Sequence, residues 1–183
     1  MNIIRIPKDR LGVVIGPGGE TRRQLMQRSG IRIEVDSAEN EVTIHDEADG
    51  VDPIMALKMR DIVRAIGRGF SPENAMRLFS DDAYFELVDI HEFTGKSRER
   101  QRQVTARLIG TDGKTRRILE EQTGCNLAVY GHTVGIIGGI DEIVIAKQAV
   151  EMICGGAEHA SVYRFLETQR RKARRAGAEL WEP

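Results

Sequence analysis

Ile15-Gly16-Pro17-Gly18-Gly19-Glu20-Thr21-Arg22-Arg23 recurs 94 residues later as Ile109-Gly110-Thr111-Asp112-Gly113-Lys114-Thr115-Arg116-Arg117. The correspondence continues without a gap to Val35 and Val129, and nine of the 21 aligned positions are identical. A repeat of this length, with glycines and arginines in register, indicates duplication of a small module. Each copy joins a tight backbone turn to positive charge, a combination suited to holding an anionic chain.

The bulk composition agrees with two small domains. The chain has 183 residues and a net charge of −1, so any affinity for nucleic acid must come from local patches. Cys125 and Cys154 lie among apolar residues without metal-ligand spacing, which favours buried free thiols. The sequence shows no signal-peptide pattern and no apolar run long enough for a membrane span, so we expect a cytoplasmic protein.

Hydrophobic patterning predicts the same order of elements, β-α-α-β-β-α, in both units. In the first unit the predicted elements are, in order, 2–6, 8–15, 20–28, 31–35, 42–45 and 54–66. In the second unit they are 85–90, 104–109, 115–122, 125–130, 134–137 and 142–153. The repeated segment, residues 15–23 and 109–117, is called the Gly word below. It joins the two short helices of each unit.

Three segments lie outside this repeat. Ser71-Pro72-Glu73 has the signals of a helix start and predicts a linker helix at 72–79. The charged segment 92–102 is predicted to be a flexible loop inserted into the second unit. A last helix is predicted at about 160–176, with a tail after it. Its Arg170–Arg175 stretch holds five cations in six residues, more than a helix dipole needs, which favours a contact with RNA.

The Gly word is suited to a nucleic-acid backbone for three reasons. Its glycines leave room for close approach, and the helix that follows offers free N–H groups and a positive dipole. The paired arginines, Arg22 with Arg23 and Arg116 with Arg117, lie close inside that helix. The strand after the helix offers Arg32 or Asn126 to the bases.

On these residues both units resemble KH domains, whose signature is Ile-Gly-X-X-Gly between two helices in the type I order. KH domains clamp about four nucleotides of single strand with that loop. The resemblance implies an α+β fold: two tandem type I KH domains, each with a three-stranded antiparallel sheet and three helices, plus a C-terminal helix. The predicted limits are 1–70 for the first domain, 71–83 for the linker helix, 84–156 for the second domain and 157–183 for the basic helix and tail.

The segment Ala65-Ile66-Gly67-Arg68-Gly69-Phe70-Ser71-Pro72-Glu73 is similar to that of archaeal relatives of the Krr/Dim/Pno ribosome-assembly factors. This resemblance implies binding of single-stranded RNA near the 3′ end of small-subunit (16S) ribosomal RNA, in assembly and processing. It also implies two protein partners, the Nob endonuclease and the alpha subunit of initiation factor two.

Both loops depart from the KH pattern, which usually has Lys or Arg at the middle positions. Pro17 has no N–H to donate, and Asp112 places a negative charge where phosphate should pass. In the second unit three cations outnumber Asp112, whereas in the first Glu20 offsets one of two arginines. Eukaryotic relatives also tend to keep the second Gly word rather than the first. We therefore predict that the second unit is the principal RNA site.

The predicted RNA-binding residues cover both loops, the basic residues after them and the adjacent strands. In the first unit they are Gly16, Pro17, Gly18, Gly19, Arg22, Arg23 and Arg32. In the second unit they are Ile109, Gly110, Thr111, Asp112, Gly113, Lys114, Arg116, Arg117 and Asn126.

No catalytic residue, cofactor or metal site is predicted. Gly113-Lys114-Thr115 resembles the end of a P-loop, but Leu108 stands where the first P-loop glycine is required. The four histidines at 45, 91, 132 and 159 are scattered along the sequence without a ligand set. Two alternatives stay open: a protein-interaction scaffold with degenerate KH domains, and a KH protein that binds other RNAs.

Overall fold

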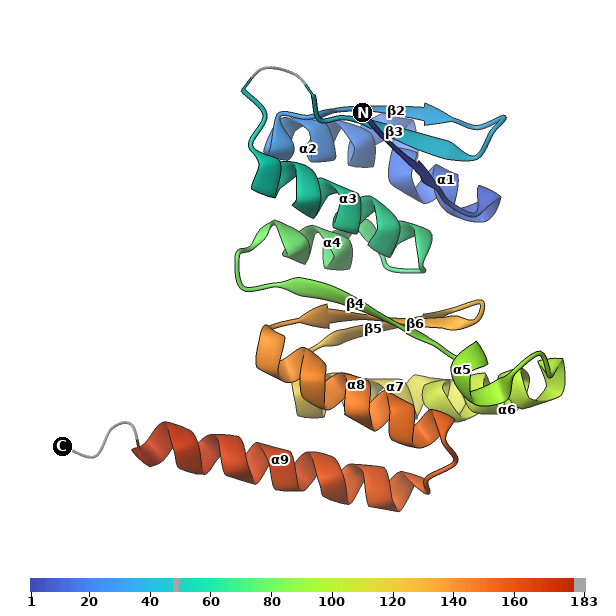
Figure 1. The fold of residues 1–183 in the computed structure, drawn as a ribbon, viewed down its shortest axis with the longest axis vertical. Coiled ribbons are helices and arrows are strands. Elements are labelled where there is room, and N and C mark those ends of the chain that lie inside the picture. The colour runs from blue at the N-terminus through green and yellow to red at the C-terminus, as the bar shows by residue number, and fades with distance from the viewer. Residues whose placement is uncertain (48–49, 180–183) are drawn as a thin grey trace. The chain divides into compact units, whose positions relative to one another are not determined.

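The computed structural model describes residues 1–47 and 50–179 (Figure 1). Contacts within the chain divide it into two compact units, Met1–Phe85 and Glu86–Pro183. Each unit has a three-stranded antiparallel sheet with helices, which confirms the predicted tandem KH fold. The domain limits at residues 70, 83 and 156 stay predictions.

The first unit has the sheet order β1-β3-β2. Its strands are β1 (Asn2–Arg5), β2 (Arg32–Asp36) and β3 (Glu41–His45). Its helices are α1 (Lys8–Ile15), α2 (Glu20–Ser29) and α3 (Pro53–Gly67), with the short turn η1 (Pro17–Gly19) between α1 and α2. The predicted linker helix is present as α4 (Pro72–Ala75) and η2 (Met76–Phe79).

Alternation along the strands decides which face of this sheet packs against the helices. Ile33, Val42 and Ile44 are buried, whereas Arg32 and Glu34 on the same sheet point to the opposite, solvated face. Buried residues of all three helices, including Leu11, Leu25 and Ile62, complete the core.

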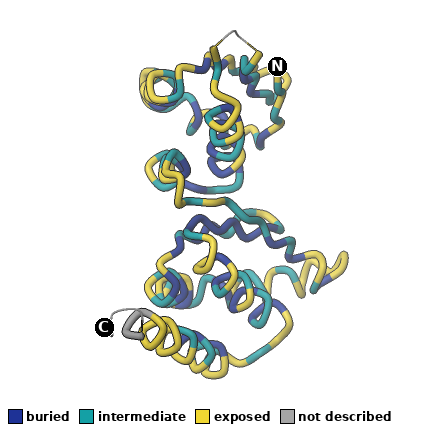
Figure 2. The backbone as a smooth tube through the Cα atoms, turned by 60° about the vertical axis from the view of Figure 1, so that its left-hand side comes forward, coloured by how far each residue is buried: buried dark blue, intermediate teal, exposed yellow. Residues whose placement is uncertain are grey.

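The second unit has the sheet order β4-β6-β5. Its strands are β4 (Tyr84–Asp89), β5 (Asn126–Tyr130) and β6 (Thr133–Gly138). Its helices are α5 (His91–Thr94), α6 (Arg98–Ile109), α7 (Lys114–Thr123), α8 (Ile140–Cys154) and α9 (His159–Glu179), and η3 (Thr111–Gly113) joins α6 to α7. Figure 2 shows the buried residues gathered along β6 and on one side of its helices. Cys125 and Cys154 are both buried and free, as predicted.

The prediction that 92–102 is a flexible loop is wrong. Part of this segment is the short helix α5, and α6 begins at Arg98, six residues earlier than the predicted helix. The Ser97 hydroxyl accepts a hydrogen bond from the Arg100 amide at 3.3 Å, which caps the helix. Charged residues here form the solvated side of a helix, because long side chains such as Arg, Glu and Gln are good helix formers.

The C-terminal helix α9 begins close to its predicted start and is three residues longer than predicted at its end. The rest of the predicted tail, 180–183, lies outside the described residues. In the part of the chain that the structure describes, no helix is both long enough and apolar enough to cross a bilayer.

Candidate nucleic-acid interface

The two Gly loops, residues 16–19 (the first loop) and 110–113 (the second loop), have the same backbone conformation. Gly16 and Gly110 have φ/ψ of 73°/170° and 73°/175°, and Gly19 and Gly113 have 78°/17° and 74°/17°. In both loops the amide of the last glycine donates to the carbonyl of the first, at 3.0 and 3.2 Å. The duplicated sequence thus builds the same tight turn twice.

Glycine is required at the first position of each loop for two reasons. A backbone with φ near +70° and ψ near 170° is essentially restricted to glycine. A Cβ on Gly110 would also lie 2.3 Å from Thr115 Oγ1 and 2.7 Å from the Thr115 amide nitrogen. The corresponding distances from Gly16 to Thr21 are 2.2 and 2.7 Å. The threonine that the two copies share, Thr21 and Thr115, is buried against the glycine in each.

The helices after the loops begin without a side-chain cap. Gly19 is the N-cap of α2 and Gly113 is the N-cap of α7, and glycine has no side chain that could accept from the first amides. Their N-termini therefore keep a partial positive charge that suits an anionic ligand.

Three exposed cations surround the second loop. The Lys114 ammonium has no hydrogen-bond or ion-pair partner among the described residues, while its backbone amide donates to the Thr111 carbonyl. The Arg117 guanidinium donates to the Asp112 carbonyl at 3.1 Å, and Arg116 Nε lies 3.9 Å from Glu120 Oε2. Asp112 itself has φ of 51°, the left-handed conformation that Asp tolerates better than most residues, and its side chain is exposed. The loop and helix start carry a net charge of +2.

The first loop is more weakly charged. Glu20 occupies the position of Lys114, and its carboxylate accepts from the Gln24 amide at 3.1 Å. Arg22 is half-buried, and its Nε has no hydrogen-bond partner among the described residues. Arg23 is exposed. The net charge of this segment is +1, and Pro17 removes one amide donor from the turn.

The predicted strand residues are not brought to the loops. Arg32 lies on the sheet face opposite to the buried Ile33, and its guanidinium donates to Glu34 Oε1 at 2.6 Å. Asn126 alternates in the same way with Leu127, which belongs to the core of the second unit. The loop residues and the helix arginines therefore lie together in each unit. Arg32 is exposed on the solvated face of its sheet, whereas Asn126 is half-buried on the sheet face opposite to Leu127.

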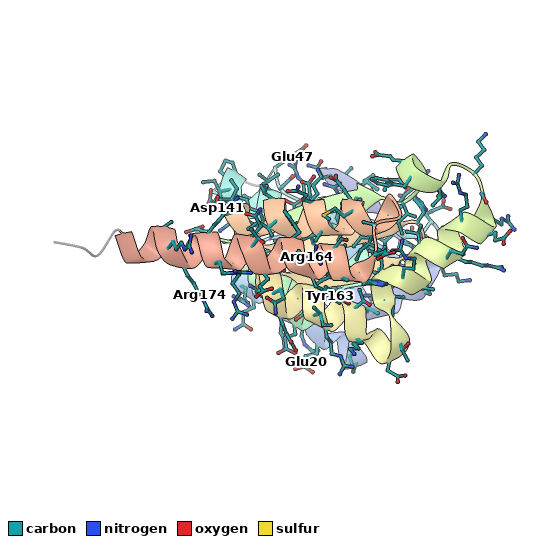
Figure 3. The ribbon with its side chains drawn as sticks, turned by 90° about the horizontal axis from the view of Figure 1, so that it is seen from below. Glu20, Glu47, Asp141, Tyr163, Arg164 and Arg174 are labelled. Atoms are coloured by element: carbon teal, nitrogen blue, oxygen red, sulfur yellow. The ribbon has the colours of Figure 1, made fainter. Side chains whose placement is uncertain are left out.

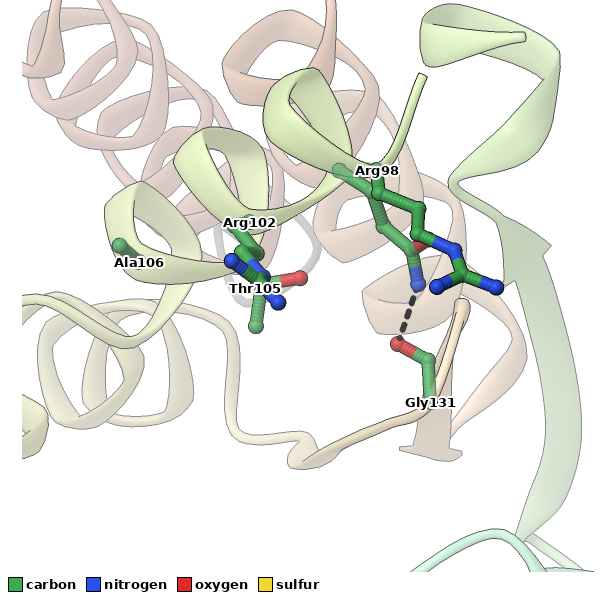
Figure 4. A pocket seen from close by; sticks show the side chains of 6 residues that line it. Arg98, Arg102, Thr105, Ala106 and Gly131 are labelled. Carbon is green, nitrogen blue, oxygen red and sulfur yellow. Dashed lines mark hydrogen bonds between the residues drawn. The ribbon is translucent and has the colours of Figure 1, made fainter. Parts of the chain in front are cut away.

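Sequence reasoning missed a basic pocket on the helix that leads into the second loop (Figure 4). It has a volume of about 430 Å³ and is lined by residues of α6 and of the turn between β5 and β6. Arg98, Arg102 and Thr105 line it from the helix, and the Gln101 amide donates to the Gly131 carbonyl at 3.1 Å. Ala106, also in its lining, accepts the hydrogen bond from the Gly110 amide that ends α6. The pocket therefore lies along α6, and the second loop follows at the end of the same helix.

The signal for this pocket is in the sequence. Ser97 followed by Glu99 is a helix start with an acid in the first turn, and it places Arg98 and Arg102 one turn apart on one side of the helix. In the described part of the first unit, α1 lacks the corresponding turn, because it has eight residues against twelve in α6 and begins directly after Pro7.

The expectation that the histidines are scattered is wrong for two of them. The His91 and His132 rings stack with centroids 4.3 Å apart and planes 12° apart. With Asp89 they form a group whose ligand atoms lie within 4.8 Å of one another, a set of donor types that could hold a metal ion. The group forms because the Ile90 amide donates to the His132 carbonyl, which joins the end of β4 to the turn between β5 and β6.

These features define a protein with two type I KH folds, and comparisons with known proteins agree. Residues 84–171 match the model of the eukaryotic type KH domain (KH-domain type I), and residues 2–57 match the KH domain model. The KH domain-containing protein MJ0443 of Methanocaldococcus jannaschii is 46% identical over 182 residues, which cover 100% of this chain and 79% of that protein. The chain belongs to this family.

Other relatives define the branch. The pre-rRNA-processing protein PNO1 of Coccidioides immitis is 22% identical over 90% of this chain, which spans 65% of the fungal protein. The crystal structure of Dim2p from Pyrococcus horikoshii has a TM-score of 0.82 and 43% identity, covering 91% of this chain and 98% of that one. A protein of unknown function from Aeropyrum pernix has a TM-score of 0.92 and 37% identity, covering 98% and 96%. The chain is therefore an archaeal tandem KH-domain protein of the Krr/Dim/Pno ribosome-assembly family.

Proposed function

We propose that this chain holds single-stranded RNA at the 3′ end of small-subunit ribosomal RNA, and that the second KH domain is the principal site. The observation that carries the proposal is the group of three exposed cations, Lys114, Arg116 and Arg117, at a Gly loop of the second unit. The helix that leads into this loop, α6, also lines a basic pocket. Glycines let the backbone of the strand approach, and the uncapped start of α7 and the three cations attract its phosphates.

The action is positioning without chemistry by the chain itself. A strand clamped at the loop is shielded, or is presented to a processing enzyme, and the protein needs no reactive group for either. The name of the fungal relative, a pre-rRNA-processing protein, supports a place in ribosome biogenesis. A Pyrococcus horikoshii complex of a/eIF2alpha, aDim2p and rRNA supports RNA and the alpha subunit of initiation factor two as partners. The matching chain of that complex has 42% identity and a TM-score of 0.86, covering 93% of this chain and 94% of that one. The Nob endonuclease is a further proposed partner, because it would act on the strand that this chain holds.

A matched pair of charge reversals tests the proposal on the full chain. Arg116→Glu with Arg117→Glu should weaken binding of a 12-nucleotide strand copied from that rRNA terminus by at least about 100-fold, since each charged hydrogen bond contributes about 1.5–3 kcal/mol. The control is Arg22→Glu with Arg23→Glu, the same change in the first unit, for which we expect a loss below about fivefold. Binding is measured by titration at one salt concentration, and circular dichroism checks folding. Unchanged affinity of the first variant would remove the second loop as the site.

The choice of RNA is tested separately. Crosslinking the chain to total cellular RNA and mapping the sites should recover the 3′ end of small-subunit rRNA. Crosslinks spread over messenger RNAs would instead favour a general KH protein.

The first unit has a second candidate role, as a surface for a protein partner. Pro17, Glu20 and the half-buried Arg22 weaken its phosphate contacts. We expect Gly16→Asp with Gly19→Asp, checked for folding, to change RNA affinity little. A strong loss would show that the first loop also binds RNA.

A further inference from the structure

Helix α9 has two parts with different surroundings. In its first part Val162 and Leu166 are buried, and the helix packs against α7 and α8. From Arg170 to Ala176 every residue is exposed, although the helix continues to Glu179. We call residues 170–176 the projecting segment. Figures 1 and 3 show α9 extending past the beginning of α8, and Figure 2 shows it becoming exposed toward its end.

The projecting segment has no face to bury against its own domain. Val162, Leu166 and Gln169 form a stripe at helical spacing, and Ala173 and Ala176 continue it with small, exposed side chains. Packing usually provides most of the stability of a helix in a protein. A segment that stays helical without such packing presents its side chains to a partner on several sides.

The charge of this segment is not explained by the helix dipole. The stabilising effect of cations falls off within the last turn, and the last turn of α9 holds no basic residue. The five cations lie before it, and two pairs at i, i+4, Arg170 with Arg174 and Arg171 with Arg175, repel each other. Arg171 lies 3.4 Å from Glu167, whereas Lys172, Arg174 and Arg175 have no ion-pair partner among the side chains that the structure describes, which end at Ala176. An external anion would relieve this repulsion.

The projecting segment begins beside the helix that follows the second Gly loop. Arg170 Nη1 donates to Gln122 Oε1 of α7 at 3.4 Å. Figures 1 and 3 show α7 and α9 running in the same direction. With a rise of about 1.5 Å per residue, Arg117 lies about 8 Å before Gln122, and Arg174 lies about 6 Å beyond Arg170. The path along the two helices from Arg117 to Arg174 is therefore about 14 Å, the length of about four stacked nucleotides.

We infer that the projecting segment is a second phosphate site for the same single strand. This inference rests on the proposed RNA-binding function. The strand held at the second Gly loop continues along α7, passes the exposed Glu121 and reaches the five cations of α9. The partner class is single-stranded RNA, because the site extends a surface already suited to its phosphates.

Strand length tests the inference on the full chain. The probes are uridine homopolymers of 4 and 12 nucleotides, which leave the register free. The test variant replaces all five cations, Arg170, Arg171, Lys172, Arg174 and Arg175, by alanine, which preserves helix propensity. The matched control replaces the four arginines by lysine, which keeps the charge.

We expect native chain and alanine variant to bind the 4-mer within twofold of each other. The native chain should bind the 12-mer at least about tenfold tighter than the alanine variant does. The slope of log affinity against log salt concentration should also be steeper for the native chain, by about 0.7 for each phosphate contact that the variant lacks. The lysine variant should stay within about threefold of native for both probes.

Equal affinities of the native chain and the alanine variant for the 12-mer would overturn the inference. An acidic protein surface would then be the better candidate partner of the projecting segment. Equal losses for both probes would also overturn it, since they would show that the segment supports the first contact instead of extending the path. If the native chain bound neither probe nor the rRNA-terminal strand, the proposed function would fail, and the inference with it.

Discussion

Helices α1 and α6 lead into Gly loops whose backbone angles agree within about 10°, yet the surfaces around the two loops differ. The first loop has Pro17 and Glu20, and α1 begins directly after a strand. The second has Thr111 and Lys114, and one additional turn of α6 supplies a basic pocket. A backbone motif is thus retained for its turn, while affinity for phosphate depends on side chains around it that can diverge freely.

The shared backbone is the first feature to test. We expect Gly16→Ala and Gly110→Ala each to lower the free energy of unfolding by about 3 kcal/mol, because both place a Cβ against a threonine in a glycine-only conformation. Urea denaturation followed by circular dichroism measures this. The control is Gly12→Ala in α1, where a Cβ meets nothing within 4 Å and should stabilise the helix by up to about 1 kcal/mol. If only one of the two alanine variants lost stability, the two loops would not share the same backbone requirement.

The different charges are tested by exchanging them. Lys114→Glu gives the second loop the residue of the first, and should lower RNA affinity about tenfold through loss of one cation and gain of one anion. Glu20→Lys gives the first loop the residue of the second. In a chain that also carries Arg116→Glu and Arg117→Glu, Glu20→Lys should raise RNA affinity about threefold to tenfold. Titrations with one strand at one salt concentration compare the two; no gain from Glu20→Lys would mean that charge alone does not separate the loops.

The third position of the loops gives a smaller effect. Gly18 and Asp112 share a left-handed conformation, with φ of 56° and 51°. Asp112→Asn keeps a residue that tolerates this conformation and removes the negative charge, so RNA affinity should rise about threefold. Gly18→Asp should lower the free energy of unfolding by about 1 kcal/mol. A fall in affinity for Asp112→Asn would show that the carboxylate contributes to binding.

The thiols report on one unit alone, since both cysteines lie in the second. Burial, with a smaller contribution from Glu151, raises the pKa of Cys154 to about 11. At pH 8 we therefore expect slow labelling of the native chain by a thiol reagent, with rates that rise toward pH 11. Because folding holds this thiol protonated, the second unit should lose a little stability as pH rises from about 9 to 11. Fast labelling at pH 8 in the folded chain would contradict the burial of these side chains.

Much of the fold could be predicted because it depends on local sequence patterns such as strand alternation and helix caps. The strand at 32–36 alternates cleanly, Gly30 and Gly124 end helices in the left-handed conformation, and Ser71 caps the linker helix. The segment 92–102 was predicted wrongly, since a helix with one narrow buried stripe has little hydrophobic periodicity and its start signal, Ser97 before Glu99, was the only local indication. Arg32 and Asn126 were assigned to the groove by nearness in sequence, whereas the pleat of the strand places them on the other face.

By itself the sequence determined the duplication, the turn and the class of ligand, because glycines at fixed spacing followed by arginines are a local property of the chain. The tertiary structure decided what surrounds each loop. It joined Gln101 to Gly131 across 30 residues, stacked His91 on His132, and placed Arg170 beside Gln122. Such sites depend on which elements pack together, and packing arises from the burial of apolar faces over the whole domain, which no short stretch of sequence specifies.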